Sequence, residues 1–308
     1  MKVKLAYGTL LQRLPPTEAL RQAIDAERMG FDSIWVDDHF VPFQGLSTTL
    51  SGFAWTWMSS ALQMTERAFF STGVTAPIMR YHPAIVAQAF ATMGAMYPGR
   101  VRIGVGSGEA PNEMAVRGGE WPSPGTRLDM LAEALTVMNR LWTSAEPVNC
   151  KGTYYTLNNA PALPRSAEKI PVYVSAIGPR AAKLAGRLGD HLITIVSDPR
   201  VVKDVIFPNF EASAREAGKD LTKMEHAVLL MYVYDPDHQI PPEALKVSAE
   251  DTKVEATQQL ELWHSAEDII KRTEELQGIG FDHIIFDNFS LDQELSLKVF
   301  KDVLPHVR

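Results

Sequence analysis

Short apolar segments and longer amphipathic segments alternate along the whole of this chain. The apolar segments are typical of buried parallel strands and lie at residues 3–8, 33–36, 69–75, 101–106, 172–176, 191–194, 227–233 and 283–286. Helices are expected at residues 18–29, 84–96, 127–142, 180–188, 201–217, 267–276 and 291–303, and a Trp-rich segment surrounds Trp55 and Trp57. Strands that each precede a helix or a helix-bearing excursion predict an α/β protein with a (β/α)8 TIM barrel. A doubly wound open sheet is the alternative.

Two segments are longer than such a barrel requires. Residues 148–157, with Lys151-Gly152 at their centre, predict a β-hairpin insertion. Residues 235–264 are longer and more polar than a βα loop needs, which favours a lid over the barrel mouth. No linker or low-complexity break divides residues 1–308, so we expect one domain.

Composition narrows the classes of function. The 308 residues carry a net charge of −7 without a basic stripe, which argues against a nucleic-acid partner and leaves a small-molecule substrate. Cys150 is the only cysteine, so we expect no internal disulfide and a reducing, cytoplasmic location. The first residues lack the apolar core of a signal peptide, and no long apolar run occurs, so no membrane span is expected.

Two strand ends carry side chains suited to acid–base chemistry. Residues 33–36 run into Asp37-Asp38-His39, and residues 101–106 run into Ser107-Gly108-Glu109. Active sites of (β/α)8 barrels lie where the strands end. A histidine and a carboxylate from two such strands can act as base and acid at one mouth. A strand-end turn with an aspartate cap is the alternative for the first of these segments.

The glycines around Gly108 do not form a dinucleotide-binding fingerprint. The third glycine of that pattern would stand where the chain has Glu109. A tight turn is the plain alternative, but the polar residues Glu109, Asn112 and Glu113 favour a functional turn.

A third turn, after residues 172–176, has the features of a phosphate site. Small residues precede a helix that opens near Pro179, and such a helix N-terminus favours an anion. An ordinary βα turn explains the same pattern equally well. His82 is expected to cap the next helix, and no cluster has the spacing of a metal site, so we expect no metal.

Together these segments resemble the luciferase-like barrel superfamily, in its branch that uses the deazaflavin coenzyme F420. The resemblance is nearer to F420-dependent secondary alcohol dehydrogenases than to F420-dependent glucose-6-phosphate dehydrogenases. It rests on residues 36–40, 77–81, 91–93, 97–101, 104–113, 119–122, 189–192, 216–220 and 223–226.

The resemblance implies a deazaflavin lying across the barrel mouth and a role for each matching residue. His39 would take the hydroxyl proton of an alcohol, and Glu109 would stand near a nitrogen of the ring. The residues implied in cofactor binding are Asp38, Gly73, Val74, Thr75, Gly108, Asn112, Ser175, Ala176, Ile177 and Gly178, with a cis peptide bond between Gly73 and Val74. Phe43 and Met231 are expected in the substrate pocket, and relatives are commonly homodimers.

Three departures from the family pattern bear on the substrate. Phe43 stands where the family usually has tryptophan, and Gln12-Arg13 stands where the alcohol dehydrogenases have a glutamate. The sugar-phosphate enzymes hold phosphate with a threonine and a lysine after the sixth strand, whereas this chain has Asp198 in that stretch. Since an acid repels phosphate, this speaks against glucose 6-phosphate.

We therefore expect an F420-dependent oxidoreductase acting on a CH–OH group, most simply a secondary alcohol. The alternatives are an FMN-dependent luciferase-like monooxygenase, an F420-dependent sugar-phosphate dehydrogenase, and a flavin-binding protein without activity. The choice of F420 over FMN rests on the resemblance alone.

Overall fold

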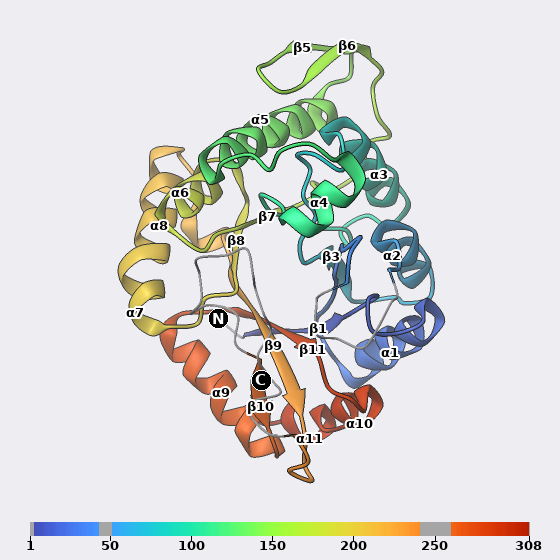
Figure 1. Cartoon of the computed structure of the whole chain (residues 1–308), viewed down its shortest axis with the longest axis vertical. Helices are drawn as coiled ribbons and strands as arrows, with labels where there is room; N and C mark the ends of the chain where they lie inside the picture. Colours follow the sequence, from blue (N-terminus) through green and yellow to red (C-terminus); the bar gives the residue numbers. More distant parts are fainter. Residues whose placement is uncertain (1–2, 43–50, 241–259, 308) are drawn as a thin grey trace.

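A closed barrel of parallel strands forms the centre of the molecule (Figure 1). The computed structural model describes residues 3–42, 51–240 and 260–307. The barrel strands are β1 (Lys4–Thr9), β2 (Ser33–Val36), β3 (Phe69–Thr72), β4 (Ile103–Val105), β7 (Val172–Ser175), β8 (His191–Thr194), β9 (His226–Tyr234) and β11 (His283–Asn288). They pair in chain order, β11 pairs with β1, and parallel bridges at Phe70–Val101 and Thr75–Val105 close β3 against β4. The barrel prediction is confirmed, and the open sheet is excluded.

Helices surround the strands and cover their outer faces. They are α1 (Pro16–Met29), α2 (Ala54–Gln63), α3 (Pro83–Met96), α4 (Ala110–Arg117), α5 (Pro124–Thr143), α6 (Pro179–Leu188), α7 (Pro199–Val201), α8 (Phe207–Glu216), α9 (Ala266–Ile279), α10 (Gln293–Lys298) and α11 (Phe300–Val303). Short helices η1 (Val202–Ile206) and η2 (Leu221–Lys223) flank α8. Among the described residues, no helix is both long and apolar enough to cross a bilayer.

The structure departs from the expected elements in several places, and the helix expected at 291–303, for example, is divided into α10 and α11. The helix expected at 201–217 is divided, because Pro208 has no N–H to continue the α-helical bonding and the preceding turn, η1, is a wider π-helix. Helix α4 was expected only as a turn, although Pro111 in its first turn is a sequence signal for a helix start.

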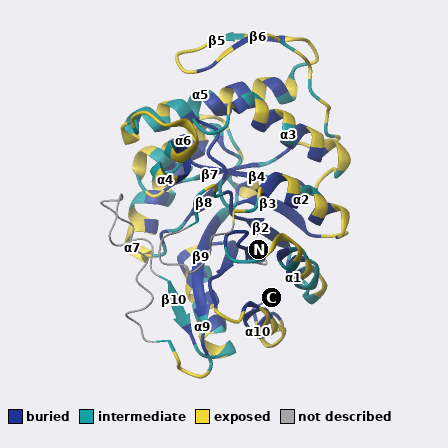
Figure 2. Ribbon diagram, turned by 45° about the vertical axis from the view of Figure 1, so that its right-hand side comes forward, coloured by how far each residue is buried: buried dark blue, intermediate teal, exposed yellow. Residues whose placement is uncertain are grey.

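The two insertions differ in how far they can be described. Strands β5 (Val148–Lys151) and β6 (Thr156–Ala160) form an antiparallel hairpin that extends beyond α5 (Figures 1 and 2). Most of the expected lid, residues 241–259, lies outside the described residues. Its last part contains β10 (Glu261–Trp263), which extends the sheet beside β9.

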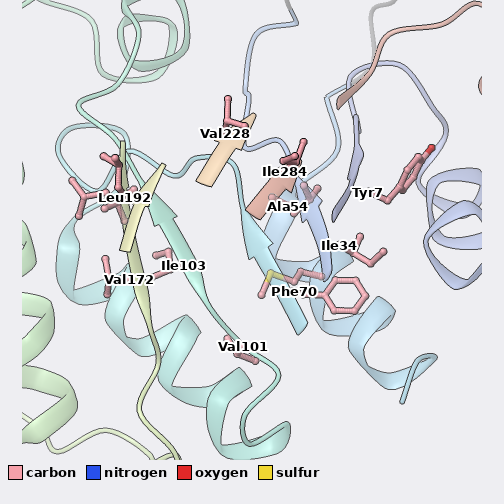
Figure 3. Packing of buried hydrophobic residues seen from close by; sticks show 14 of the residues in the cluster. Tyr7, Ile34, Ala54, Phe70, Val101, Ile103, Val172, Leu192, Val228 and Ile284 are labelled. Carbon is pink, nitrogen blue, oxygen red and sulfur yellow. The ribbon is translucent and has the colours of Figure 1, made fainter. Parts of the chain in front are cut away.

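The apolar core has two layers, and the strands between them are buried (Figure 2). Outward-facing residues such as Phe70, Ile103 and Leu192 pack against the helices (Figure 3). Inside the barrel, a second cluster includes Trp35 and Leu229. Alternate side chains of a strand point to opposite faces, which produces the two layers.

A buried ionic network closes the N-terminal end of the barrel. Glu225 accepts hydrogen bonds from Arg102 at 3.1 Å and from Tyr173 at 2.5 Å, and its Oε2 lies 3.1 Å from Nδ1 of His283. Lys4 adds an ion pair to the same carboxylate. Although burial opposes it, the partners, first of all His283, hold the pKa of Glu225 well below its usual range. This network, the barrel floor, leaves the opposite end as the mouth.

Candidate active site

The end of β2 leads into the three polar residues that form one side of the mouth. Asp37 is buried, and its Oδ1 accepts a hydrogen bond of 2.6 Å from the backbone N–H of Leu11. Burial raises the pKa of Asp37 to about 6. His39 is half-buried, and its Nδ1 lies 3.2 Å from Nε2 of Gln12. This contact orients the imidazole ring at the mouth.

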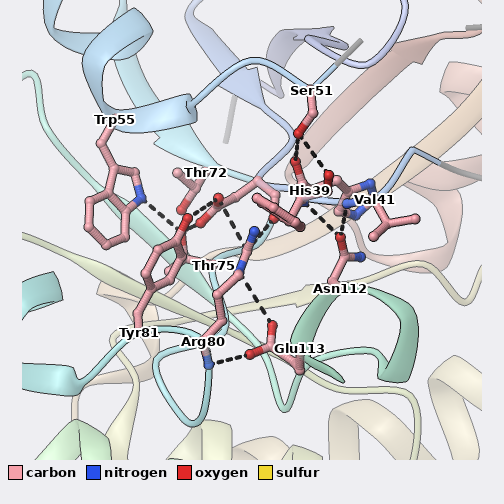
Figure 4. Close-up of polar contacts among 12 residues, drawn as sticks. His39, Val41, Ser51, Trp55, Thr72, Thr75, Arg80, Tyr81, Asn112 and Glu113 are labelled. Carbon is pink, nitrogen blue, oxygen red and sulfur yellow. Dashed lines mark hydrogen bonds and ion pairs between the residues drawn. The ribbon is translucent and has the colours of Figure 1, made fainter. Parts of the chain in front are cut away.

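A polar cluster surrounds the buried Asp38. Figure 4 labels its members Thr75, Arg80, Tyr81 and Glu113. Its carboxylate accepts hydrogen bonds from Thr75 Oγ1 at 2.7 Å, Tyr81 OH at 3.1 Å and Arg80 Nη2 at 3.3 Å. Arg80 also donates to the carbonyl of Asp38, and its backbone N–H donates to Glu113 at 2.7 Å. The cluster therefore fixes the chain that carries His39 against the segments that follow β3 and β4.

Arg80 and Glu113 form the buried ion pair of this cluster. Their side chains are 5% and 1% exposed, and Arg80 Nε lies 3.7 Å from Glu113 Oε1. Burial raises the pKa of Glu113. Sequence reasoning assigned no role to Arg80 or Gln12, although both stand in βα loops at the mouth, where position alone could have suggested one.

Asn112 joins the two candidate catalytic segments. Its Oδ1 accepts hydrogen bonds from the backbone N–H groups of Phe40 and Val41 at 2.8 and 2.9 Å (Figure 4). Its Nδ2 donates to Glu109 at 3.4 Å. One buried amide thus links the segment of His39 to Glu109, and both predicted catalytic residues lie at the same mouth.

The turn at Gly108 requires glycine. Its φ of +74° lies in the left-handed region, and a Cβ there would be 3.0 Å from Cγ of Glu113. This turn makes Glu109 the residue that precedes α4, half-buried at the mouth. A functional turn at this position agrees with the geometry.

The segment after β3 lies beside β4, because Thr75 forms a parallel bridge with Val105. Gly73 and Val74 are joined by a cis peptide bond, at the position that the resemblance implies. Val74 packs against two glycines of the next strand end, because a Cβ at Gly106 would lie 2.8 Å from Val74 Cγ2 and one at Gly104 would lie 3.0 Å from Val74 Cγ1. Thr75 is fully buried and hydrogen-bonded to Asp38. These residues form the inner wall of the mouth.

The turn after β7 has the form of an anion site. Ser175 ends β7, Ala176 is buried, Ile177 is 44% exposed, and Gly178 precedes α6. No side chain caps the first turn of α6, and a Cβ at Gly178 would meet no atom within 4 Å. Open space before uncapped helical N–H groups fits a phosphate. The phosphate-bearing part of F420 or FMN would fit here.

The stretch that was expected to disfavour a sugar-phosphate substrate lies at the start of α7. Asp198 Oδ1 accepts hydrogen bonds from the backbone N–H groups of Arg200 and Val201, at 2.8 and 3.4 Å. The carboxylate therefore already occupies this helix N-terminus. A substrate phosphate would meet a negative charge at that position.

The remaining predicted residues have simpler positions. Met231 is buried on β9, inside the barrel near the mouth, whereas Phe43 lies outside the described residues. His82 accepts a hydrogen bond from the N–H of Ala84, so its prediction as a cap of α3 is confirmed. In the parts of the chain that are described, no group of three or more His, Cys, Asp or Glu is placed to hold a metal ion.

Comparisons with known proteins agree with this architecture. The family model for luciferase-like monooxygenase matches residues 4–245. F420-dependent glucose-6-phosphate dehydrogenases of Amycolatopsis mediterranei and Microbacterium testaceum are 35% and 32% identical to the chain, over 99% of it and 99% and 98% of their own lengths.

Solved structures give the same result. An F420-dependent secondary alcohol dehydrogenase in complex with an F420–acetone adduct is 44% identical, with a TM-score of 0.91 and 100% of both chains covered. The F420-dependent tetrahydromethanopterin reductase of Methanopyrus kandleri is 20% identical with a TM-score of 0.80, which shows a shared fold. On its sequence and its barrel alike, this chain belongs to the luciferase-like monooxygenase family.

Proposed function

We propose that this protein is an F420-dependent oxidoreductase that transfers a hydride between a secondary alcohol and the deazaflavin. The observation that carries the proposal is the link through Asn112 between the segment of His39 and Glu109. A base for the substrate and an acid for the cofactor are the two proton-transfer groups that such a reaction needs.

In the oxidative direction, His39 accepts the hydroxyl proton of the alcohol as the hydride leaves the carbinol carbon. Gln12 holds the ring through its contact with Nδ1, and the Asp38 cluster holds the backbone on which the ring stands. A positioned general base of this kind contributes about 10²- to 10⁴-fold to the rate.

The cofactor supplies the hydride acceptor when it is bound. Glu109, in the turn after β4, would stand near its ring, and the N-terminus of α6 would hold its phosphate. Val74, which packs against Gly104 and Gly106, would border the ring.

An uncharged alcohol is a better substrate for this mouth than a sugar phosphate. Asp198 occupies the helix N-terminus in the stretch that would hold a phosphate, and Asp37 and Asp38 are further carboxyl groups at the mouth. The 44% identical dehydrogenase, whose structure holds an F420–acetone adduct, favours the same class. Relatives of 32–35% identity are glucose-6-phosphate dehydrogenases, so that sugar phosphate is the second candidate.

The direct test is a spectroscopic assay with oxidised F420 and 2-propanol. We expect the visible absorption of F420 to disappear as acetone forms. Reduction of F420 by glucose 6-phosphate but by no alcohol would overturn the substrate class and keep the cofactor. A yellow flavin bound after purification, with oxygen consumption, would instead favour the FMN-dependent monooxygenase. F420 binding without turnover of any substrate would favour a non-catalytic protein.

A homodimer in the cytoplasm completes the proposal. Size-exclusion chromatography with light scattering tests the dimer, and fractionation of cells tests the location. Neither result bears on the chemistry.

A further inference from the structure

Asp287 is a buried acid inside the barrel that none of the roles above uses. It lies in β11, one residue before the strand ends. Ile285 and Phe289, two residues before and after it, belong to the apolar cluster inside the barrel. Since side chains alternate along a strand, Asp287 points to the same interior side, at the mouth.

The neighbouring strand leaves space for this carboxyl. Asp287 is paired in register with Gly8 of β1, and a Cβ at Gly8 would lie 1.9 Å from Oδ1 of Asp287. Any side chain at position 8 would displace the carboxyl. On its other side the register partner is Met231, a residue expected in the substrate pocket.

The Asp287 carboxyl makes no hydrogen bond or ion pair with any described residue, although Asp287 is only 8% exposed. The next residue, Asn288, is fully buried, and its amide donates to the carbonyl of Gln293. Burial raises the pKa of Asp287 well above its ordinary value, and the nearby Asp37 adds to this. Burial therefore favours the neutral form of this acid, which has a proton to donate. An unpartnered buried polar group of this kind points to a ligand.

We propose that Asp287 is a specificity-determining residue that donates a hydrogen bond to a second, uncharged oxygen of the substrate. The simplest such substrate carries a hydroxyl on the carbon beside the carbinol. The inference rests on the proposed function and names the substrate class of the same site. Asp37 disfavours an anionic group at this position, because a carboxylate or phosphate would lie beside another acid.

Arg13 is the cation that an anionic substrate could use instead. Its guanidinium carbon lies 5.9 Å from the centre of the Phe289 ring, and it makes no ion pair within the described parts of the chain. The test must therefore include a substrate with a carboxylate.

The test compares 2-butanol, 2,3-butanediol and 3-hydroxybutyrate as substrates with F420, in the full-length protein. The readout is the ratio of kcat/KM for the diol to that for 2-butanol, because a ratio within one variant cancels effects on cofactor binding. In Asp287→Leu, which keeps the branched shape of the side chain and removes the donor, we expect this ratio to fall about ten- to a hundredfold. In Asp287→Asn, which keeps a donor, we expect a ratio within about threefold of the wild-type value.

Thermal stability gives a second readout, independent of turnover. Because Asp287 has no partner, both variants should melt at or above the wild-type temperature. Asp282→Leu is the matched control beside the other end of β11. The Asp282 carboxyl accepts a hydrogen bond from the N–H of His226, which leucine cannot accept, so this variant should lose stability and keep the wild-type ratio.

The possible outcomes distinguish a failure of the role of Asp287 from a failure of the proposed function. An unchanged ratio in Asp287→Leu, a lower melting temperature in both Asp287 variants, or a preference of the wild type for 3-hydroxybutyrate would overturn the role of Asp287 alone. Failure of every alcohol to reduce F420 in the wild-type protein would overturn the proposed function, and this inference with it.

Discussion

The two ends of the barrel carry their charges in opposite ways. At the floor, the carboxylate of Glu225 lies within ion-pair distance of Lys4, Arg102 and His283. At the mouth, acids outnumber cations, and Asp37 and Asp287 form no ion pair with the described residues. Arg80 offsets part of this excess by pairing with Asp38 and Glu113.

This contrast indicates that the charged groups of the floor stabilise the fold, whereas the acids of the mouth are available to a ligand. At the floor, the partners lower the pKa of Glu225, so the charged form is stabilised within the protein. At the mouth, burial outweighs the hydrogen bond from Leu11 and raises the pKa of Asp37 to about 6, so the charged form of this acid is disfavoured. Proteins tolerate such groups mainly at functional sites.

Replacement of His39 should have the largest effect on activity. We expect His39→Ala to lower kcat by about 10²- to 10⁴-fold, because it removes the general base, with little change in F420 affinity. The F420 absorption assay measures the first effect and fluorescence titration the second. The matched control is His82→Ala, which removes the cap of α3 and should cost stability of about 1 kcal/mol while turnover persists. Unchanged turnover in His39→Ala would remove the base from the mechanism.

Replacement of Glu225 should have the largest effect on stability. In Glu225→Gln, Arg102 keeps its positive charge in a largely buried site without this counter-charge. We expect the free energy of unfolding to fall by about 3–5 kcal/mol, measured by urea denaturation. The exposed Lys223→Gln serves as the control and should leave it unchanged. A loss below about 1 kcal/mol would show that the floor does not depend on this ion network.

The pH dependence of stability should distinguish the mouth acids. The folded-state pKa of Asp37 is raised from 3.8 to about 6, so its contribution is present at low pH and is lost as pH rises through about 6. This shift in the pKa of Asp37 corresponds to a loss of roughly 3 kcal/mol in the free energy of unfolding. Asp37→Asn should therefore gain stability relative to wild type between pH 4 and 7, measured by melting temperature.

The variant Asp198→Asn should show a pH dependence of stability opposite in sign to that of Asp37→Asn. A hydrogen bond from the backbone N–H of Arg200 lowers the pKa of Asp198, so its contribution is present at neutral pH and is lost on acidification. This variant should lose stability relative to wild type as pH rises from 3 to 5. The same sign in both variants would contradict the assignment of the pKa directions.

The smallest effect is expected for replacement of Asn112, and it should appear in both activity and stability. Asn112→Ala removes two hydrogen bonds to backbone N–H groups and one to Glu109. We expect a loss of about 1–3 kcal/mol in unfolding free energy, and a lower kcat through misplacement of His39. Asn112→Asp, which keeps the acceptor oxygen, should restore most of the stability. Full activity in Asn112→Ala would show that the link is dispensable.

The barrel could be predicted because its pattern is local. Each strand is a short apolar run and each helix has its own periodicity, so the order of elements follows without knowledge of their contacts. Strand ends then placed His39 and Glu109 at one mouth. The limits of α4 and the division at Pro208 were missed, because both depend on how one proline shifts backbone bonding.

The contacts of the site could not be predicted in the same way. Arg80 reaches Asp38 across 42 positions of the chain, and Asn112 reaches Phe40 across 72. Asp287 carried no signal either, since a lone acid at a strand end is unremarkable until Gly8 is seen to leave room for it. Such pairings depend on the closure of the barrel and not on any local pattern.

The amide of Asn112 also limits how this site can be exchanged with that of a relative. The segment after β2 and the turn after β4 are far apart in the chain, but the Asn112 side chain connects them by hydrogen bonds. Transplanting either segment alone would leave backbone N–H groups without an acceptor or an amide without its donors. For engineering, the two segments therefore form one structural unit, and a chimaera should carry both or neither.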